Sequence, residues 1–119
     1  MSQVSDSTIR LLEKFLDVAS QRHQMVTTNI ANVDTPGYRT RDIDFRSELE
    51  RAAAAGPANL IPVVRQVSGL IERPDGNNVS MEREGLLLAE TQMQFGLGVQ
   101  LLRHEFQQLL MAINEGSKG

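Results

Sequence analysis

Two pairs of acidic residues have a spacing that could support acid/base chemistry or glycoside hydrolysis. They are Asp42 with Asp44, and Glu82 with Glu84. Neighbours at i and i+2 on a helix point about 200° apart, so Glu82 and Glu84 cannot face one substrate. Asp42 and Asp44 share a face only in an extended segment, and no apolar residues are placed there to perturb their pKa values. The sequence therefore predicts that the protein is not an enzyme, and an acid/base enzyme using Asp42 or Asp44 is the weakest hypothesis.

Metal ligands are also missing from the pattern. The chain has no cysteine, and neither His23 nor His104 has a second ligand three or four residues away. Such a partner is typical of zinc sites. His23 lies on an apolar helical line, so we expect a hydrogen-bonded interface residue there. We predict no metal and no cofactor.

Charge and hydropathy exclude two further classes of protein. The net charge is -3, from 12 basic and 15 acidic residues without a basic block, and aromatic residues make up 4% of the chain. A nucleic-acid platform normally carries a positive stripe and stacking aromatics. No apolar run approaches the roughly 20 residues that span a bilayer. The N-terminus lacks the pattern of a cleaved signal peptide. We expect no nucleic-acid partner and no membrane insertion.

Both ends of the chain carry heptad patterns. The helices that these patterns predict must position the rest of the chain. Over residues 7–32, apolar positions alternate three and four residues apart, and a second line (Leu11, Phe15, Val18 and Met25) widens the face. This spacing predicts a coiled-coil-like helix that touches more than one neighbour. The main line consists of Ile9, Leu12, Leu16, Ala19, His23, Val26 and Ile30.

The C-terminal segment repeats this pattern from residue 80 onward. Ser80 is a fair N-cap, and Asn114 and Gly116 predict the end of the helix. Gly96 and Gly98 weaken the helix by about 1 kcal/mol each, which favours close approach of a neighbouring helix at both positions. The predicted seam comprises Leu88, Gln92, Phe95, Val99, Leu102, Phe106, Leu109 and Ile113, with Leu97, Leu101 and Leu110 beside it.

The middle of the chain differs from both ends. Residues 47–57 predict a short helix that Gly56 and Pro57 end. Residues 60–73 are rich in β-branched side chains around Ser68 and Gly69, which predicts a short hairpin or two brief extended strands. Residues 73–78 read as a turn. The predicted fold is mainly α: long N- and C-terminal helices packed as a pair, with a small irregular or β middle. One domain is expected, with segments 1–34, 35–79 and 80–119.

A polar turn follows the first helix in the stretch NIANVDTPGYRTRDIDF, residues 29–45. Thr35 precedes proline and is therefore driven to an extended conformation, while Pro36 and Gly37 suit the centre of a type II turn. Asn32 can hydrogen-bond nearby backbone groups. Tyr38 has a flat apolar ring and a hydroxyl tip that can anchor the turn against a neighbour.

These residues resemble the N-terminal signature of bacterial flagellar rod, hook and hook-associated proteins. The short chain and the stretch DGNNVSMEREGLLLAETQMQF, residues 75–95, are most similar to the proximal rod members. Ser80 departs from the acidic residue expected in that block. The first block of the resemblance comprises Ala31, Asn32, Thr35, Pro36, Gly37 and Tyr38, and the second comprises Asn77, Asn78, Val79, Met81, Glu82 and Glu84.

The resemblance implies a structural subunit whose terminal helices assemble into a periplasm-spanning rod that transmits motor torque. It implies export by the flagellar type III apparatus without a cleaved signal peptide. The implied neighbours are other copies, the rod proteins FlgC, FlgF and FlgG, the junction protein FliE and the MS-ring protein FliF. The alternative is a self-contained soluble helical adaptor that binds a partner through its middle loop.

Overall fold

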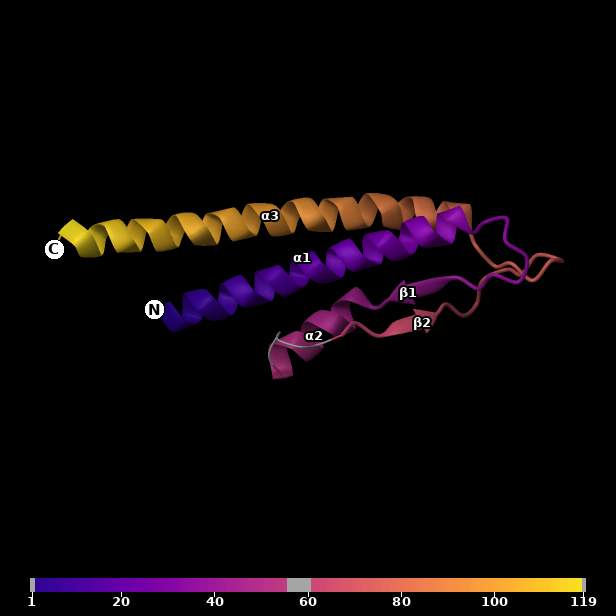
Figure 1. Cartoon of the computed structure of the whole chain (residues 1–119), viewed down its shortest axis with the longest axis horizontal. Helices are drawn as coiled ribbons and strands as arrows, with labels where there is room; N and C mark the ends of the chain where they lie inside the picture. The colour runs from indigo at the N-terminus through magenta and orange to yellow at the C-terminus, as the bar shows by residue number, and fades with distance from the viewer. Residues whose placement is uncertain (1, 56–60, 119) are drawn as a thin grey trace.

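The computed structural model describes residues 2–55 and 61–118 of an elongated molecule, 71 × 26 × 17 Å. Helices α1 (Ser2–Ala31) and α3 (Met81–Lys118) run antiparallel along its length. Between them the chain forms β1 (Arg41–Ile43), α2 (Phe45–Ala55) and β2 (Val64–Gln66), which we call the arm. In Figure 1, α1 lies between α3 and the arm. The predicted mainly α fold with two long packed helices is confirmed.

Helix α1 buries two faces because it has a neighbour on each side. Val18, Ala19 and Val26 are at most 1% exposed. Against the arm, the ring of Phe15 meets that of Phe45 edge to face, with centroids 5.0 Å apart and an interplanar angle of 82°. This packing explains the second apolar line of α1. All seven residues of the main line are buried or partly buried: Ile9, Leu12, Leu16, Ala19, His23, Val26 and Ile30.

Helix α3 packs on α1 through residues that lie one position earlier in the sequence than predicted. Thr91 and Gly98 are buried, whereas the heptad pattern pointed to Gln92 and Val99. The residues of α3 that contact α1 are small or polar. The heptad pattern counts mainly large apolar residues, so it pointed to positions beside this contact. Four residues of the predicted seam are exposed: Gln92, Phe95 (44%), Phe106 (46%) and Ile113 (57%). The others, Leu88, Val99, Leu102 and Leu109, are partly buried.

The two glycines of α3 behave differently. A Cβ atom on Gly98 would lie 2.7 Å from Leu16 Cδ2 and 2.8 Å from Phe15 Cδ1, so the two helices approach closely there. A Cβ atom on Gly96 would meet nothing within 4 Å. The expectation of close packing therefore holds for Gly98 and is wrong for Gly96 within this chain.

The ends of the helices agree only in part with the sequence signals. Ser80 caps α3 as predicted, because its hydroxyl accepts a hydrogen bond of 3.2 Å from the Arg83 amide. The predicted stop at Asn114 and Gly116 is wrong, since α3 continues to Lys118. Both residue types weaken a helix without forbidding it. Helix α1 begins at Ser2, earlier than predicted.

The arm corrects one expectation and extends another. Helix α2 begins two residues before the predicted start at 47, and Asp44 caps it through a 3.1 Å hydrogen bond from the Ser47 amide. The predicted stop residues Gly56 and Pro57 lie outside the described residues. The hairpin predicted around Ser68 and Gly69 is wrong, because β2 pairs antiparallel with β1, far earlier in the chain. Local turn signals cannot reveal such a long-range pairing.

Neither long helix, over the described residues, is apolar enough to cross a membrane.

Candidate functional site

The most ordered polar structure lies at the end of the molecule where α1 turns back and α3 begins. We call it the joint; it comprises residues 29–42 and 73–84. It contains two turns from distant parts of the sequence, one at residues 35–38 and one at residues 73–76. Figure 1 shows both chain segments crossing beyond the ends of the two helices.

The first turn has the geometry expected from its sequence. The Tyr38 amide donates to the Thr35 carbonyl at 3.2 Å, and Gly37 has a φ of 75°. A positive φ at this position is what a type II turn requires. The Gly37 amide also donates to the Asp75 carbonyl at 2.8 Å. A Cβ atom added to Gly76 would lie 3.4 Å from the Gly37 Cα, so the two turns touch backbone to backbone.

Asn29 connects α1 to both the arm and α3. Its side chain is 1% exposed and all of its hydrogen-bonding capacity is used. Its amide nitrogen donates to the Arg41 carbonyl at 2.8 Å and to Glu84 Oε1 at 2.7 Å. Its oxygen accepts from the Tyr38 hydroxyl at 2.8 Å and from the Arg41 amide at 3.2 Å. Tyr38 therefore anchors the turn to its own α1.

The second sequence block closes the joint from the other side. The Asn77 side chain, 0% exposed, donates to the carbonyls of Asn32 and Thr35, each at 2.9 Å. The Asn78 side chain accepts a 2.6 Å hydrogen bond from the Thr40 amide. These carbonyls and this amide lie where helix or strand pairing is absent, so the two asparagines supply the partners that the backbone needs.

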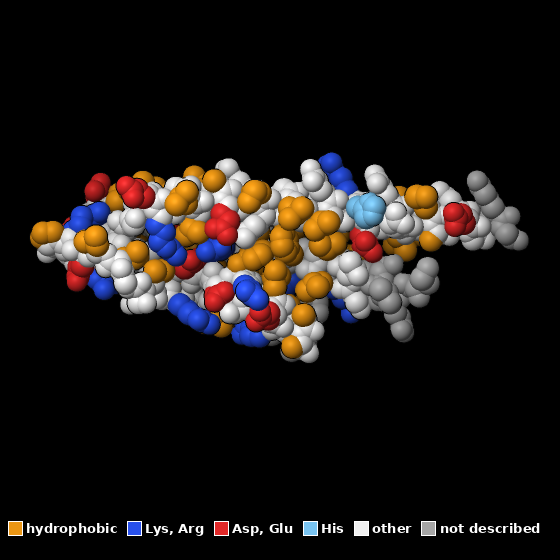
Figure 2. Space-filling view, turned by 180° about the vertical axis from the view of Figure 1, so that it is seen from behind, with side chains coloured by type: hydrophobic (Ala, Val, Ile, Leu, Met, Phe, Trp, Pro, Cys, Tyr) orange, Lys and Arg blue, Asp and Glu red, His pale blue; other side chains and the backbone are white. Residues whose placement is uncertain are grey.

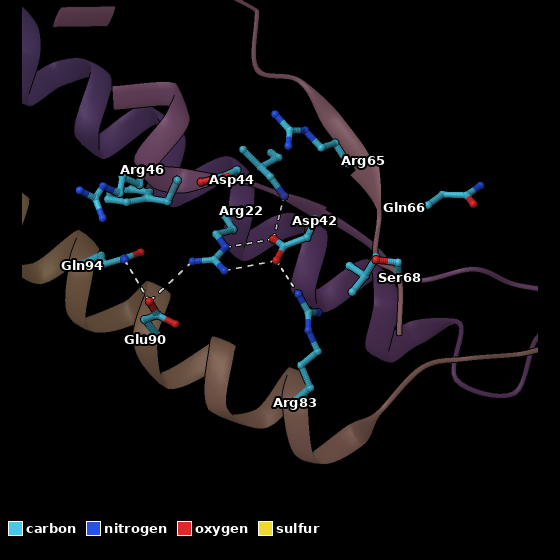
Figure 3. A pocket seen from close by; sticks show the side chains of 13 residues that line it. Arg22, Asp42, Asp44, Arg46, Arg65, Gln66, Ser68, Arg83, Glu90 and Gln94 are labelled. Carbon is cyan, nitrogen blue, oxygen red and sulfur yellow. Dashed lines mark hydrogen bonds and ion pairs between the residues drawn. The ribbon is translucent and has the colours of Figure 1, made fainter. Parts of the chain in front are cut away.

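A cluster of opposite charges holds the arm against both helices (Figure 3). Asp42 of β1 accepts a bidentate pair from Arg22 of α1, at 3.0 and 3.2 Å, and a 2.6 Å bond from Arg83 of α3. Arg83 also binds Glu84, which is 0% exposed, at 2.7 Å. We call these four residues the clasp. Bidentate arginine pairs are strong and directional, so the clasp sets the position of the arm.

The opposite charges of the clasp favour the ionised forms of Asp42 and Arg22. Burial by itself would raise the pKa of Asp42, but the hydrogen bonds and charge of Arg22 and Arg83 outweigh burial and hold that pKa below its usual value. Burial likewise opposes the charge of Arg22, and Asp42 reverses this effect and raises the pKa of the guanidinium. Asp42 is therefore a fixed anion, which is unsuitable as a general base.

The space beside the clasp is an open, polar cleft of about 670 Å³ between α3 and the arm. Arg46 and Arg65 lie along its arm side, and Glu90 and Gln94 lie along α3. Within residues 2–55 and 61–118, no group of His, Cys, Asp and Glu side chains is arranged to hold a metal ion. His23 instead shares a 2.8 Å hydrogen bond with Thr91 across the two helices, and His104 is exposed.

A second candidate surface is the side of α3 that faces away from α1. Leu86, Met93 and Met111 each follow a buried or partly buried residue by two positions, a rotation of about 200° on a helix, and Leu97 lies on the same heptad line. We call this surface the outer stripe; it comprises Leu86 (74% exposed), Met93 (70%), Leu97 (49%) and Met111 (56%). Its spacing of seven, four and fourteen residues is that of a heptad seam.

Apolar surface also remains between the helices. A groove of about 380 Å³ between α1 and α3 is lined by His23, Thr91 and Phe95, among others. Figure 2 shows apolar side chains gathered in the middle of one face, with charges of both signs around them. Large exposed apolar areas of this kind mark sites of protein association.

Known proteins are similar in sequence to this chain over the first turn and over most of its length. Residues 16–39, which contain the first turn and Asn29, match the family model described as flagella basal body rod protein. A flagellar basal body rod protein FlgB from Cereibacter sphaeroides is 33% identical over 77% of this chain and 82% of that protein. The chain belongs to the FlgB family. FlgB proteins of Salmonella typhimurium (29% identical, 94% of this chain and 96% of the relative) and Borrelia hermsii (28%, 92% and 98%) extend the similarity over nearly the whole length.

This FlgB-family chain is a structural rod subunit of the flagellar basal body, and it is not an enzyme. It assembles with other basal-body components.

The structure distributes the predicted site residues over different environments. Asn32 and Tyr38 of the first block are partly buried, whereas Ala31, Thr35, Pro36 and Gly37 are exposed. In the second block, Asn77, Asn78, Val79 and Glu84 are buried, and Met81 and Glu82 are exposed.

Sequence reasoning gave Asn29, Arg22 and Arg83 no role and considered Asp42 only as an acid or base. Asn29, Arg22 and Asp42 have roles that no short-range pattern reveals, because their partners are 9 to 68 residues away. A signal existed for Asn29 alone: it is a polar residue beside the apolar line of α1.

Proposed function

We propose that this chain joins the rod mainly through α3, with the outer stripe and the groove between α1 and α3 packing against helices of neighbouring subunits. The observation that carries the proposal is the concentration of exposed large apolar side chains on α3. They comprise Met81, Leu86, Met93, Phe95, Leu97, Leu101, Phe106, Leu110, Met111 and Ile113.

Two separate surfaces on one helix suit an open helical assembly. A non-closing arrangement requires heterologous contacts, in which one surface of a subunit meets a different surface of the next. The outer stripe and the groove lie on different sides of α3 and satisfy this requirement. The predicted seam residues that remain exposed, Phe95, Phe106 and Ile113, belong to the groove side of this proposal.

The joint supplies the rigid shape in this proposal. The clasp and the asparagine bonds hold the arm and both helices as one unit, and the turn at Pro36 and Gly37 sets the direction in which the chain leaves α1. Segments 1–34, 35–79 and 80–119 then act as a single domain. Torque passes through the subunit without hinge motion, because each element of the joint is bonded to the others.

The place of the subunit in the rod is a further part of the proposal. The family similarity supports a proximal position, next to FliE and the MS-ring protein FliF at one end and FlgC, with FlgF and FlgG beyond, at the other. It also supports a periplasmic rod built from subunits that the flagellar type III apparatus exports.

A charge on the outer stripe tests the role of α3. Leu97→Asp places a carboxylate in the proposed interface, where an unpaired buried charge is strongly unfavourable. We expect the variant to fold as the parent does, because Leu97 is exposed in the isolated chain, but to be absent from isolated basal bodies and to abolish motility.

Gln107→Asp is the matched control, since it introduces the same charge at an exposed polar position of the same helix. It is expected to enter the rod. Normal incorporation of Leu97→Asp would remove the outer stripe from the interface. The seam variant Leu102→Asp is a weaker test, because Leu102 is partly buried and its substitution also damages the monomer.

A further inference from the structure

Strand β2 has one edge that nothing in the described chain covers. It pairs with β1 in the register Arg41↔Gln66, Asp42↔Arg65 and Ile43↔Val64. In Figure 1 it is the outer strand of the arm, and all three of its residues are exposed. A two-stranded sheet of this length is marginal in water, and a third strand would complete it.

The direction of the backbone groups at this edge follows from their hydrogen bonds. The Val67 amide donates to the Thr40 carbonyl at 2.9 Å, and the Val63 amide donates to Glu48 at 3.3 Å. Backbone groups alternate along a strand, so the N–H and C=O of Val64 and Gln66 point away from β1. Unpaired strand edges are templates for pairing with another chain.

Residues 70–72 belong to no helix or strand, and their backbone groups make no hydrogen bond to another backbone group within the described residues. They follow the bend at Gly69, whose φ is 82°. Ile71 is 90% exposed. Glu72 is held only by an ion pair of 3.1 Å with Arg39, and both side chains are about half exposed. Such surface pairs contribute little and exchange easily.

The charges of β2 and of residues 70–72 favour one pairing over another. Pairing of β2 with β2 of another copy, centred on Arg65, would place two arginines opposite each other, which is unfavourable. Antiparallel pairing of β2 with residues 70–72 places Arg65 opposite Glu72 and Gln66 opposite Ile71. Arg65 is exposed, and within its own chain its charge already acts on Asp44, so Glu72 of another copy would be an additional partner of opposite charge.

We propose that the outer edge of β2 takes residues 70–72 of a second copy as an added strand, in the register Arg65↔Glu72. This contact is heterologous, so it propagates from copy to copy without closing, as a rod requires. The inference rests on self-assembly of the subunit, and it uses a surface distinct from α3.

Disulfide cross-linking tests the register, because the chain has no cysteine of its own. Directly opposite residues have Cα atoms about 5.5 Å apart, within the range that a disulfide spans. Basal bodies containing the Gln66→Cys, Ile71→Cys double variant are expected to give a ladder of linked subunits on oxidation, and each single variant is expected to give none. Assembled rods without any link would overturn the strand pairing and leave the role of α3 standing.

A charge swap provides a second readout. In the double cysteine variant, Arg65→Glu should lower the linked fraction at least severalfold, and adding Glu72→Arg should restore it. A linked fraction that is the same in all three would overturn the register. A photo-reactive residue at position 66 that captures a different rod protein would overturn the second copy as the occupant.

Discussion

The joint and the exposed last stretch of α3, residues 110–116, which we call its free half, stabilise structure by opposite means. The joint buries polar groups, including Asn29, Asn77 and Glu84, and satisfies each with hydrogen bonds from distant segments. The free half of α3 leaves Leu110, Met111 and Ile113 more than half exposed. Both regions belong to one chain and are joined by one helix.

The difference concerns specificity. A buried polar network is stable only when every partner is in place, so it accepts a single geometry. Apolar burial is non-directional and grows with the area covered, so an exposed apolar surface gains stability from any partner of matching shape. Substitutions in the joint should therefore destabilise the isolated chain, whereas substitutions on the free half should act only on assembly.

The largest effect on the isolated chain is expected from Asn29→Leu. The substitution keeps a side chain of similar branching but leaves Glu84 Oε1 and the Arg41 backbone without their Asn29 partners. Arg83 still binds Glu84, but each buried group that loses its hydrogen bond costs about 1–3 kcal/mol, so the free energy of unfolding should fall by about 3 kcal/mol or more. Urea unfolding followed by circular dichroism measures the change.

Gln24→Leu provides the control on the same helix, at an exposed position. Its effect should stay within about 0.5 kcal/mol. Equal unfolding free energies for Asn29→Leu and Gln24→Leu would contradict the central role of the asparagine.

A smaller loss is expected from Asp42→Asn, which removes the anion of the clasp. Hydrogen bonds to charged groups contribute about 1.5–3 kcal/mol. The folded pKa of Asp42 lies below its unfolded value of about 3.9, so its contribution is present above that pH and is lost as pH falls through the lower, folded pKa. Unfolding curves should show that the stability difference between the parent and the variant converges towards zero as the pH falls from 7 towards 2.5.

Asp44→Asn tests whether that convergence belongs to the clasp. Hydrogen bonds from Ser47 lower the pKa of Asp44, but asparagine caps a helix about as well as aspartate. The variant should therefore keep most of the acid sensitivity of the parent. A parent whose stability is unchanged between pH 5 and pH 2.5 would contradict the role of Asp42.

The two glycines of α3 allow the same substitution to be compared two residues apart. Gly98→Leu forces a side chain against Leu16 and Phe15 and should destabilise by about 1–3 kcal/mol through overpacking. Gly96→Leu enters open space and should stabilise the isolated helix by about 0.5–1 kcal/mol. Thermal unfolding of both variants measures the difference. A stability change of the same sign in both variants would contradict the contact geometry of α1 and α3.

The smallest effect is expected at the tip of the joint. Gly37 has a φ of 75°, so Gly37→Ala should cost about 1 kcal/mol from backbone strain, although the added Cβ has space. Gly37→Asn should cost less, because asparagine tolerates this conformation. Motility of the Pro36→Ala, Gly37→Ala double variant tests whether the turn direction matters in the rod. If neither the free energy of unfolding nor motility changed, the turn would serve only to connect α1 to the arm.

Local signals in the sequence predicted the elements whose causes are local. The heptads predicted both long helices, Ser80 marked the start of α3, and Pro36 with Gly37 marked a type II turn. Each of these depends on residues within a few positions of one another. The stop signals at Asn114 and Gly116 failed because the energies involved are small.

The sequence by itself determined that this chain forms two long helices and a polar turn after the first of them, because periodicity, caps and turns act over a few residues. Only the tertiary structure decided which face of α3 meets α1, that β1 pairs with β2, and that Asp42 binds both Arg22 and Arg83. These choices depend on contacts between residues far apart in the chain. Their energy depends on burial and on complete sets of partners, which a linear pattern does not contain.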